Sequence, residues 1–195
     1  MVNLCTCSAR RWLVVSLGLL ASCMAWADNP RVRIETDFGT LEAELFPQRA
    51  PRTVANFLRY VADGSYDGTA FHRVIDGFMV QGGGYTPDGQ RIRARSPIPN
   101  ESAQTPSNTR GTLAMARTPD PDSATSQFFI NQVDNGFLDA SPGRPGYTVF
   151  GALLTGHEVL DRIAAVPTHA NDQPLQPVVI RRIETIEAEP AASGT

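Results

Sequence analysis

Residues 31–37 (RVRIETD) and 41–46 (LEAELF) alternate between apolar and polar positions, and together they predict a β-hairpin. Val32 and Ile34 fall on one face of the first stretch, and charged residues fall on the other. A period of two is typical of a half-buried strand, because successive side chains point to opposite faces of the sheet. Residues 38–40 (FGT) have the composition of the turn that joins the two stretches.

Two later stretches have apolar residues at the spacing of an α-helix. The first begins at Pro51, because proline is favoured at the first helical position, and it ends at residues 63–64 (DG). The second covers residues 157–165. The residues expected to face inward are Val54, Phe57, Leu58 and Val61 in the first helix and Val159, Leu160 and Ile163 in the second.

Short strands account for most of the other apolar stretches. Residues 82–110 are polar and rich in proline, which predicts a long irregular loop, and residues 188–195 predict a flexible tail. Two helices among about eight strands favour an antiparallel barrel, because closure of the sheet removes exposed strand edges. Besides the hairpin, strands are expected at residues 71–74, 79–81, 111–117, 127–131, 148–151 and 178–186.

Residues 1–27 have the features of an export signal. Arg10 and Arg11 precede an apolar run at residues 12–21, and residues 25–27 (AWA) form a cleavage site. An apolar run of ten residues is too short to cross a membrane, which takes about 20. We therefore expect cleavage before the domain begins, and no transmembrane span.

A second interpretation of the leader concerns Cys23. Residues 20–23 (LASC) resemble a bacterial lipobox, which would place a lipid on this cysteine. Both routes put the domain at residues 28–187 outside the cytoplasm. We expect a periplasmic protein, with the lipid-anchored form as the alternative.

Composition and charge exclude several classes of chemistry. All 17 basic residues are arginine, against 20 acidic residues and a net charge of −3. Without lysine there is no Schiff base and no P-loop phosphate site, and the near-neutral charge argues against nucleic acid as a partner. The three cysteines lie within residues 1–27, so the domain has no disulfide or cysteine nucleophile. The three histidines share no metal-ligand spacing, and we expect neither metal nor cofactor.

Three segments combine apolar residues with isolated polar ones. In residues 71–83 (FHRVIDGFMVQGG), strand geometry places Arg73 on the same face as Phe71 and Ile75. Its guanidinium then either reaches solvent at a barrel rim or acts as a fixed cation beside an apolar pocket. The other two segments, taken alone, have the composition of core strands; they are residues 111–117 (GTLAMAR) and 126–131 (SQFFIN).

Taken in order, these three segments and the FLD at residues 137–139 resemble the cyclophilin-type peptidyl-prolyl cis-trans isomerases. The stretch MARTPDPDSATSQFFIN and the leader are similar to the Gram-negative periplasmic branch. The similarity covers residues 30–186. It implies a mainly β fold, a closed eight-stranded antiparallel barrel capped by two α-helices. It also implies an enzyme that accelerates rotation about X–Pro bonds in exported, folding proteins.

The resemblance also implies roles for individual residues. Arg73 resembles the family's catalytic arginine, and His72 and Gln81 complete the candidate catalytic group. Residues 116–118 resemble the segment whose backbone holds the substrate extended. The residues expected to contact the substrate are Phe78, Met79, Ala116, Arg117, Thr118, Gln127, Phe129, Phe137, Leu138 and Tyr147.

Three departures from the family pattern concern the substrate site. Phe137 stands where eukaryotic members usually carry tryptophan, and Tyr147 stands where they usually carry histidine. Arg117 replaces their asparagine, but the contact there is made by the backbone and should be retained. We therefore expect weak cyclosporin binding with catalysis retained. The expected partners are proline-containing polypeptide segments, and the expected state is a monomer.

An isomerase needs none of the chemistry that the composition excludes. The barrier to rotation of about 18–20 kcal/mol comes from amide resonance, so no bond is broken and no nucleophile is needed. A donor aimed at the prolyl nitrogen stabilises the twisted state, and Arg73 can supply it. Two alternatives remain at this point, a module that only binds proline-containing segments and a metal-dependent barrel enzyme. A row of arginines at 91, 93 and 95 is either solvated loop or a surface for an acidic partner.

Overall fold

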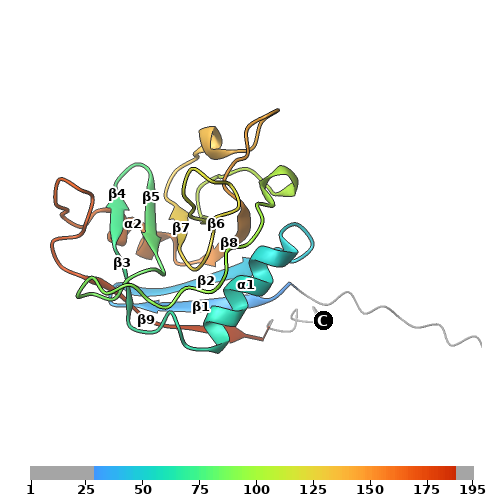
Figure 1. Cartoon of the computed structure of the whole chain (residues 1–195). Coiled ribbons are helices and arrows are strands. Elements are labelled where there is room, and N and C mark those ends of the chain that lie inside the picture. Colours follow the sequence, from blue (N-terminus) through green and yellow to red (C-terminus); the bar gives the residue numbers. More distant parts are fainter. Residues whose placement is uncertain (1–28, 188–195) are drawn as a thin grey trace, which may run out of the picture.

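The predicted hairpin opens the fold. In the computed structural model, which describes residues 29–187, β1 (Arg31–Thr36) pairs antiparallel with β2 (Gly39–Leu45) and places Ile34 opposite Leu41. Alternate residues of both strands are buried, as the period of two requires. In the sheet the hairpin lies between the last strand of the chain and a strand from residues 149–155 (Figure 1).

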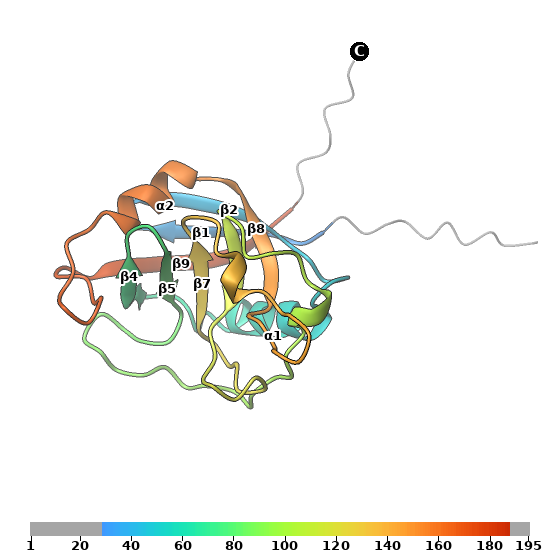
Figure 2. The same ribbon diagram turned by 90° about the horizontal axis from the view of Figure 1, so that it is seen from above.

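The described strands form one antiparallel sheet of nine, in the order β3-β9-β1-β2-β8-β6-β7-β5-β4. The two strands at its edges, β3 (Thr69–Phe71) and β4 (Arg73–Ile75), are consecutive in the sequence and separated only by His72. The chain itself therefore joins the two edges, and the sheet curls into a nearly closed barrel (Figures 1 and 2). The remaining strands are β5 (Met79–Gly82), β6 (Thr112–Met115), β7 (Phe128–Asn131), β8 (Val149–Thr155) and β9 (Val178–Ile186).

This architecture confirms the predicted barrel and corrects one of its strands. A continuous strand over residues 71–74 is wrong, because the strand breaks at His72. Phe71 is buried in the main core, whereas Arg73 is exposed and Ile75 packs against a second apolar cluster. The shared face predicted for these three residues does not form. When β3 and β4 are counted as one interrupted strand, the barrel has the expected eight strands.

Two α-helices cover the barrel on opposite sides (Figure 2). They are α1 (Pro51–Ala62) and α2 (His157–Ala164), and each ends within one or two residues of its predicted boundary. The N-terminus of α1 has no cap from its own Ala50. Instead, the carboxylate of Glu101 accepts hydrogen bonds from the Thr53 N–H at 2.9 Å and the Arg52 N–H at 3.1 Å. This contact ties α1 to the irregular segment that precedes β6.

The side chains form two separate apolar clusters, and the alternation of the strands explains why. In β7, Phe128 points into the barrel and Phe129 points out of it. The main core contains a group of edge-to-face and tilted rings, of which Phe57 and Phe150 are 5.0 Å apart. The second, outer cluster consists of Met79, Ala114, Phe129 and Val149, with Phe46, Ile75, Phe78, Ala116, Leu138 and Tyr147 packed against it.

The long segment predicted as loop is largely irregular, with one short 3-10 helix, η1 (Ser102–Gln104). A second, η2 (Gly136–Leu138), lies where the sequence predicted no helix. Near the start of the loop Tyr85 pairs with Ala70 and with Arg91 through isolated bridges, which holds the segment against the barrel.

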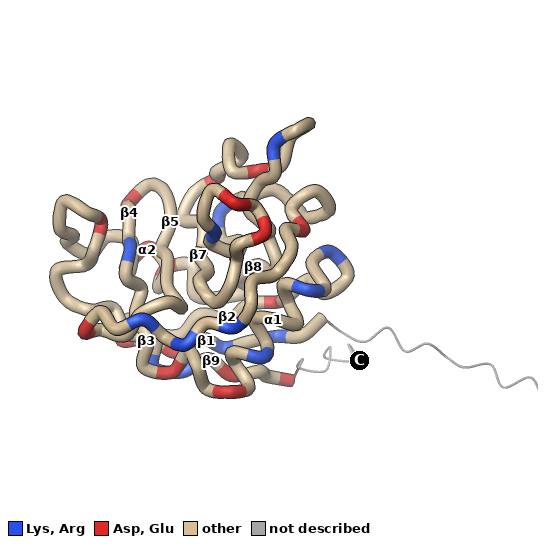
Figure 3. The backbone as a smooth tube through the Cα atoms, viewed as in Figure 1, with Lys and Arg blue, Asp and Glu red and all other residues tan. Residues whose placement is uncertain are grey.

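Charged residues of both signs are interspersed along the backbone (Figure 3). The arginine row of the loop is not a uniform basic face, because Arg95 forms an ion pair with Asp63 and its guanidinium lies 5.6 Å from the Tyr60 ring. Within residues 29–187 no helix is long and apolar enough to cross a membrane. The predicted export signal, Cys23 and the tail at 188–195 lie outside the described residues.

Candidate active site

A cavity of about 130 Å³ lies over the outer apolar cluster. Its lining combines four large apolar side chains with two arginines and one glutamine. The residues that line it are Arg73, Phe78, Met79, Gln81, Ala116, Arg117, Phe129, Leu138 and Tyr147. All nine are among the site residues predicted from the sequence.

The strand register brings the central side chains of this cavity together. Arg73 of β4 is opposite Gln81 of β5, and Gln81 is opposite Phe129 of β7. Phe129 is in turn opposite Ala114 of β6, and Ala114 is opposite Val149 of β8. Directly opposed residues share a face of the sheet. The row therefore runs from a cation at one end to an apolar floor at the other.

Arg73 is held at the edge of the cavity by the loop that follows α2. Its Nε donates to Oδ2 of Asp172 at 3.1 Å, and the side chain of Arg73 remains 44% exposed. The carbonyl oxygen of Asp172 also accepts the Val74 N–H at 2.8 Å. No acceptor within residues 29–187 engages the Nη atoms of Arg73, so these donors are free to face a ligand in the cavity.

A polar edge connects the cavity to the segment after β6. Nε2 of Gln81 donates to Oε1 of Gln127 at 2.9 Å. The carbonyl oxygen of Gln127 accepts the Ala116 N–H at 3.0 Å. These two bonds fix the orientation of Gln81 and the start of the segment at residues 116–118 relative to each other.

Arg117 stabilises the rim of the cavity at residues 145–147. Its guanidinium lies 4.6 Å from the centre of the Tyr147 ring and donates to the carbonyl oxygens of Pro145 at 2.9 Å and Gly146 at 3.2 Å. The Tyr147 ring meets Phe129 edge to face at 5.6 Å. The Arg117 side chain therefore serves the packing of the rim, in addition to the backbone role implied by the resemblance.

Four predicted residues lie outside the lining of this cavity. Phe137 is 62% exposed and stacks on Phe78 at 5.7 Å, so it covers the outside of the cavity wall. Thr118 bonds through its hydroxyl to Ser123 at 2.8 Å. Gln127 and His72 line a neighbouring pocket that begins at Arg73.

The imidazole of His72 is kept neutral by its surroundings. Burial lowers the pKa of His72 below 6.5, and the charge of Arg73 acts in the same direction. Its ring meets Tyr85 edge to face at 4.7 Å. A neutral histidine leaves Arg73 as the cation on this side of the cavity.

Sequence reasoning missed Asp172, the residue that holds Arg73. It lies in a polar loop, and its only sequence signal is the turn-like composition of residues 170–174 (ANDQP). Asp172 has a φ of 66°, a backbone conformation that aspartate and asparagine tolerate better than most residues. Residues 29–187 contain no group of three or more His, Cys, Asp or Glu side chains that could hold a metal ion.

Comparisons with known proteins agree with the geometry. A family model described as cyclophilin type peptidyl-prolyl cis-trans isomerase/CLD matches residues 31–185. A peptidyl-prolyl cis-trans isomerase of Acinetobacter baylyi is 48% identical over 180 residues, which cover 90% of this chain and 95% of the relative. Peptidyl-prolyl cis-trans isomerase B of Escherichia coli strain K12 is 45% identical over 163 residues, covering 80% and 99%. The crystal structure of a cyclophilin type isomerase from Cryptosporidium parvum superimposes with a TM-score of 0.71 at 30% identity, covering 83% and 99%.

Proposed function

The chain belongs to the cyclophilin-type peptidyl-prolyl cis-trans isomerases, and on that premise we propose how its residues act and which proteins they act on. The proposal is that Arg73 donates a hydrogen bond to the prolyl nitrogen while the apolar cavity holds the pyrrolidine ring. The observation that carries it is the row of opposed residues that sets Arg73 beside Gln81 and Phe129.

The chemistry follows from the electronic change during rotation. Conjugation of the amide holds the X–Pro bond planar, with a barrier of about 18–20 kcal/mol. In the twisted state the prolyl nitrogen regains a lone pair, so a donor placed there binds the transition state better than either ground state. The Nη donors of Arg73 stay charged at every working pH. A preorganised donor of this kind contributes about 3–4 kcal/mol in other enzymes.

The apolar side of the cavity performs a second task. Phe129 and Met79 are almost fully buried, and Leu138 and Phe78 pack against the cluster that contains them. A ring held against these side chains stays fixed while the residue before it turns, and the exclusion of water strengthens the field of Arg73. The segment at residues 116–118 holds the residues before the proline in extended form.

The leader supports exported, folding proteins as the substrates and the periplasm as the location, within the periplasmic branch of the family. A lipid on Cys23 is the alternative to a free form, and the intact mass of the mature protein decides between them. Weak cyclosporin binding and a monomeric state complete the proposal.

The test is a protease-coupled isomerisation assay on an X–Pro peptide with the Arg73→Ala variant. A loss in kcat/KM of about 100-fold or more is expected. Arg93→Ala removes an arginine of the distant loop and serves as the matched control, with activity retained. A loss of less than threefold in Arg73→Ala removes Arg73 from this role.

A further inference from the structure

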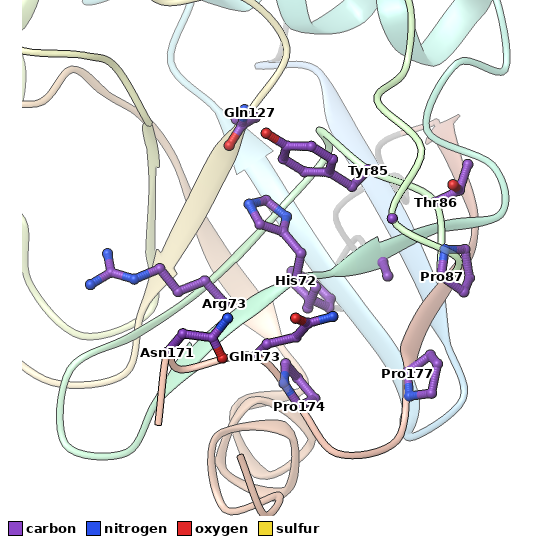
Figure 4. A pocket seen from close by; sticks show the side chains of 13 residues that line it. His72, Arg73, Tyr85, Thr86, Pro87, Gln127, Asn171, Gln173, Pro174 and Pro177 are labelled. Atoms are coloured by element: carbon purple, nitrogen blue, oxygen red, sulfur yellow. The ribbon is translucent and has the colours of Figure 1, made fainter. Parts of the chain in front are cut away.

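A second pocket adjoins the first at Arg73 (Figure 4). Its volume is about 410 Å³, which falls in the range of ligand sites and exceeds the 130 Å³ of the proline cavity. Arg73 is the one residue that lines both. The hydrogen bond from Gln81 to Gln127 forms a second point of contact, because Gln81 lines the cavity and Gln127 lines the pocket.

Four separate parts of the chain build this pocket. They are the break between β3 and β4 at His72, the start of the irregular segment at Tyr85, Gln127 just before β7, and the loop after α2. The side chains of His72 and Gln173 lie near one another across it, and Asn171 lies beside Arg73 (Figure 4).

The lining suits a segment of polypeptide. Tyr85 and three prolines offer flat apolar surfaces, and three primary amides can bond to a peptide backbone. Arg73 is the only charged residue in the lining, and His72 beside it is neutral. No carboxylate lines the pocket. The proline and amide residues are Pro87, Pro174, Pro177, Gln127, Asn171 and Gln173.

The position of the pocket along the sheet identifies its occupant. The strands of the catalytic face run in the order β6-β7-β5-β4. The segment at residues 116–118 follows β6 at one end of this face, and Arg73 begins β4 at the other. If residues before the proline lie along 116–118 and the proline fills the cavity, the chain crosses the face and leaves it at Arg73. The pocket begins there.

We propose that this pocket is a subsite for the substrate residues that follow the isomerised proline, and that it accepts aromatic or aliphatic side chains and disfavours cationic ones. The proposal rests on the placement of the proline in the cavity argued above. It extends the recognition of substrate from one ring to several residues, which is the chemistry needed to distinguish one polypeptide from another. A cationic side chain is disfavoured there, because Arg73 lines the pocket, no lining residue is a carboxylate, and the carboxylate of Asp172 is already paired with Arg73.

The test compares substrates of different length on the unmodified enzyme. A short peptide ends one residue after the proline, a second carries three more uncharged residues at that end, and a third carries the same residues before the X–Pro bond. The first extension is expected to raise kcat/KM at least threefold, through KM, and the second is not. Three lysines in place of the uncharged residues should abolish the gain.

Two variants locate the effect. Gln173→Trp fills the pocket and should make the extended and short peptides equivalent, whereas Leu175→Trp introduces the same side chain at an exposed position of the same loop and should retain the gain. Gln173→Ala provides a milder change if the tryptophan impairs folding, and it should reduce the gain. Binding of the extended peptide should also shift the backbone amide resonances of the non-proline residues of 85–89 and 171–175, which the short peptide leaves in place.

The proposal is overturned if the unmodified enzyme treats short and extended peptides alike, if only the extension before the bond is effective, or if Gln173→Trp folds and keeps the full gain. Activity on the short peptide separates this failure from failure of the proposed mechanism. That activity depends on Arg73 and the proline cavity, and not on Gln173.

Discussion

Nε of Arg73 lies 3.1 Å from Oδ2 of Asp172, so a carboxylate 99 residues further along the chain holds the arginine at the edge of the proline cavity. The same loop also bonds to the backbone of β4, through the Val74 N–H. Two bonds from one residue therefore fix both the strand and the side chain. The arrangement leaves the Nη donors of Arg73 free on the side of the cavity.

The ion pair predicts a modest effect on catalysis when Asp172 is changed. Both side chains are more than a third exposed, and exposed pairs contribute about 0.2–1 kcal/mol, which corresponds to a loss of kcat/KM of up to about fivefold. Asp172→Asn is the suitable variant, because asparagine also accepts a positive φ. The loss should appear in kcat and shrink at about 1 M salt, where exposed charges are screened.

Asp172→Gly provides the control for the backbone. Glycine adopts the observed φ of 66° without strain, so the bond to Val74 is retained while the carboxylate is removed. Equal losses in the asparagine and glycine variants assign the effect to the carboxylate. Unchanged kcat in both would show that Arg73 orients itself without help.

The burial of His72 predicts how stability and activity depend on pH. The lowered pKa means that the folded protein keeps His72 neutral at pH values where the unfolded chain binds a proton. The contribution of His72 to the free energy of unfolding is therefore fully present above about pH 6.5. It decreases as the pH falls below that value, because the unfolded state binds more protons there. By contrast, kcat/KM should be nearly flat from about pH 6 to 9, since the proposed donor is a guanidinium and the proposed mechanism uses no acid or base.

Chemical denaturation at a series of pH values measures the first part. The His72→Gln variant should lose part of the decrease below pH 6.5, whereas His169→Gln, which removes an exposed histidine, should not. An unchanged pH dependence in His72→Gln would contradict the assignment. A steep bell in the activity of the unmodified enzyme would transfer the chemistry from Arg73 to a titrating base.

The sequence was sufficient for the elements that depend on local pattern. The hairpin, both helices and the last strand follow from alternation or from a spacing of three and four residues, and these patterns fix which face is buried. The cavity lining was identified because three short sequence segments resembled a family, and composition alone would have left the strands of Phe129 and Ala114 as ordinary core. The alternation of Phe128 and Phe129 determines which cluster each residue joins.

Contacts between distant segments were not predictable in this way. The local sequence gives no signal for the break at His72. It also gives none for two contacts, the hydrogen bonds of Glu101 to α1 and the pairing of Asp172 with Arg73. A polar residue in a loop has many possible partners, and only the closed barrel selects one of them. For the same reason Phe137, expected to contact substrate, was placed by resemblance and not by any pattern of its own.

The remote cap of α1 predicts a loss of stability. Each oxygen of the Glu101 carboxylate accepts a hydrogen bond from the first turn of the helix, and Oε2 also accepts the Thr53 hydroxyl at 2.7 Å. Removal of a helix cap costs about 0.5–2 kcal/mol, so Glu101→Ala should lower the free energy of unfolding by that amount. For a domain of this size the corresponding fall in Tm is about 2–4 °C per kcal/mol.

Glu101→Gln separates the hydrogen bond from the charge. The amide oxygen still accepts a bond from the first turn, but the interaction of a negative charge with the helix dipole is lost. An intermediate Tm is expected, measured by thermal unfolding alongside Glu158→Gln in α2 as a control. Identical Tm values for the alanine variant and the unmodified protein would mean that α1 needs no cap.

The backbone of Gly146 is enclosed by the rim of the cavity. Its N–H donates to the Ser102 hydroxyl at 2.9 Å, and its carbonyl oxygen accepts bonds from Asn100 and Arg117. A β-carbon at this position would collide with the backbone nitrogen of Ala140 and would lie 2.6 Å from the carbonyl oxygen of Leu138, so the backbone that carries Leu138 would have to move.

Gly146→Ala is therefore expected to lower the free energy of unfolding by about 1–3 kcal/mol, the usual cost of overpacking, and to lower kcat/KM about tenfold by displacing Leu138. Gly136→Ala is the matched control on the same rim, since the nearest atom to its added β-carbon is Oδ2 of Asp139 at 3.8 Å, an ordinary contact. Denaturation and the isomerisation assay on both variants measure the two effects. Normal activity in a folded Gly146→Ala protein would show that the position of Leu138 does not limit catalysis, and the cavity would then tolerate a rim that moves.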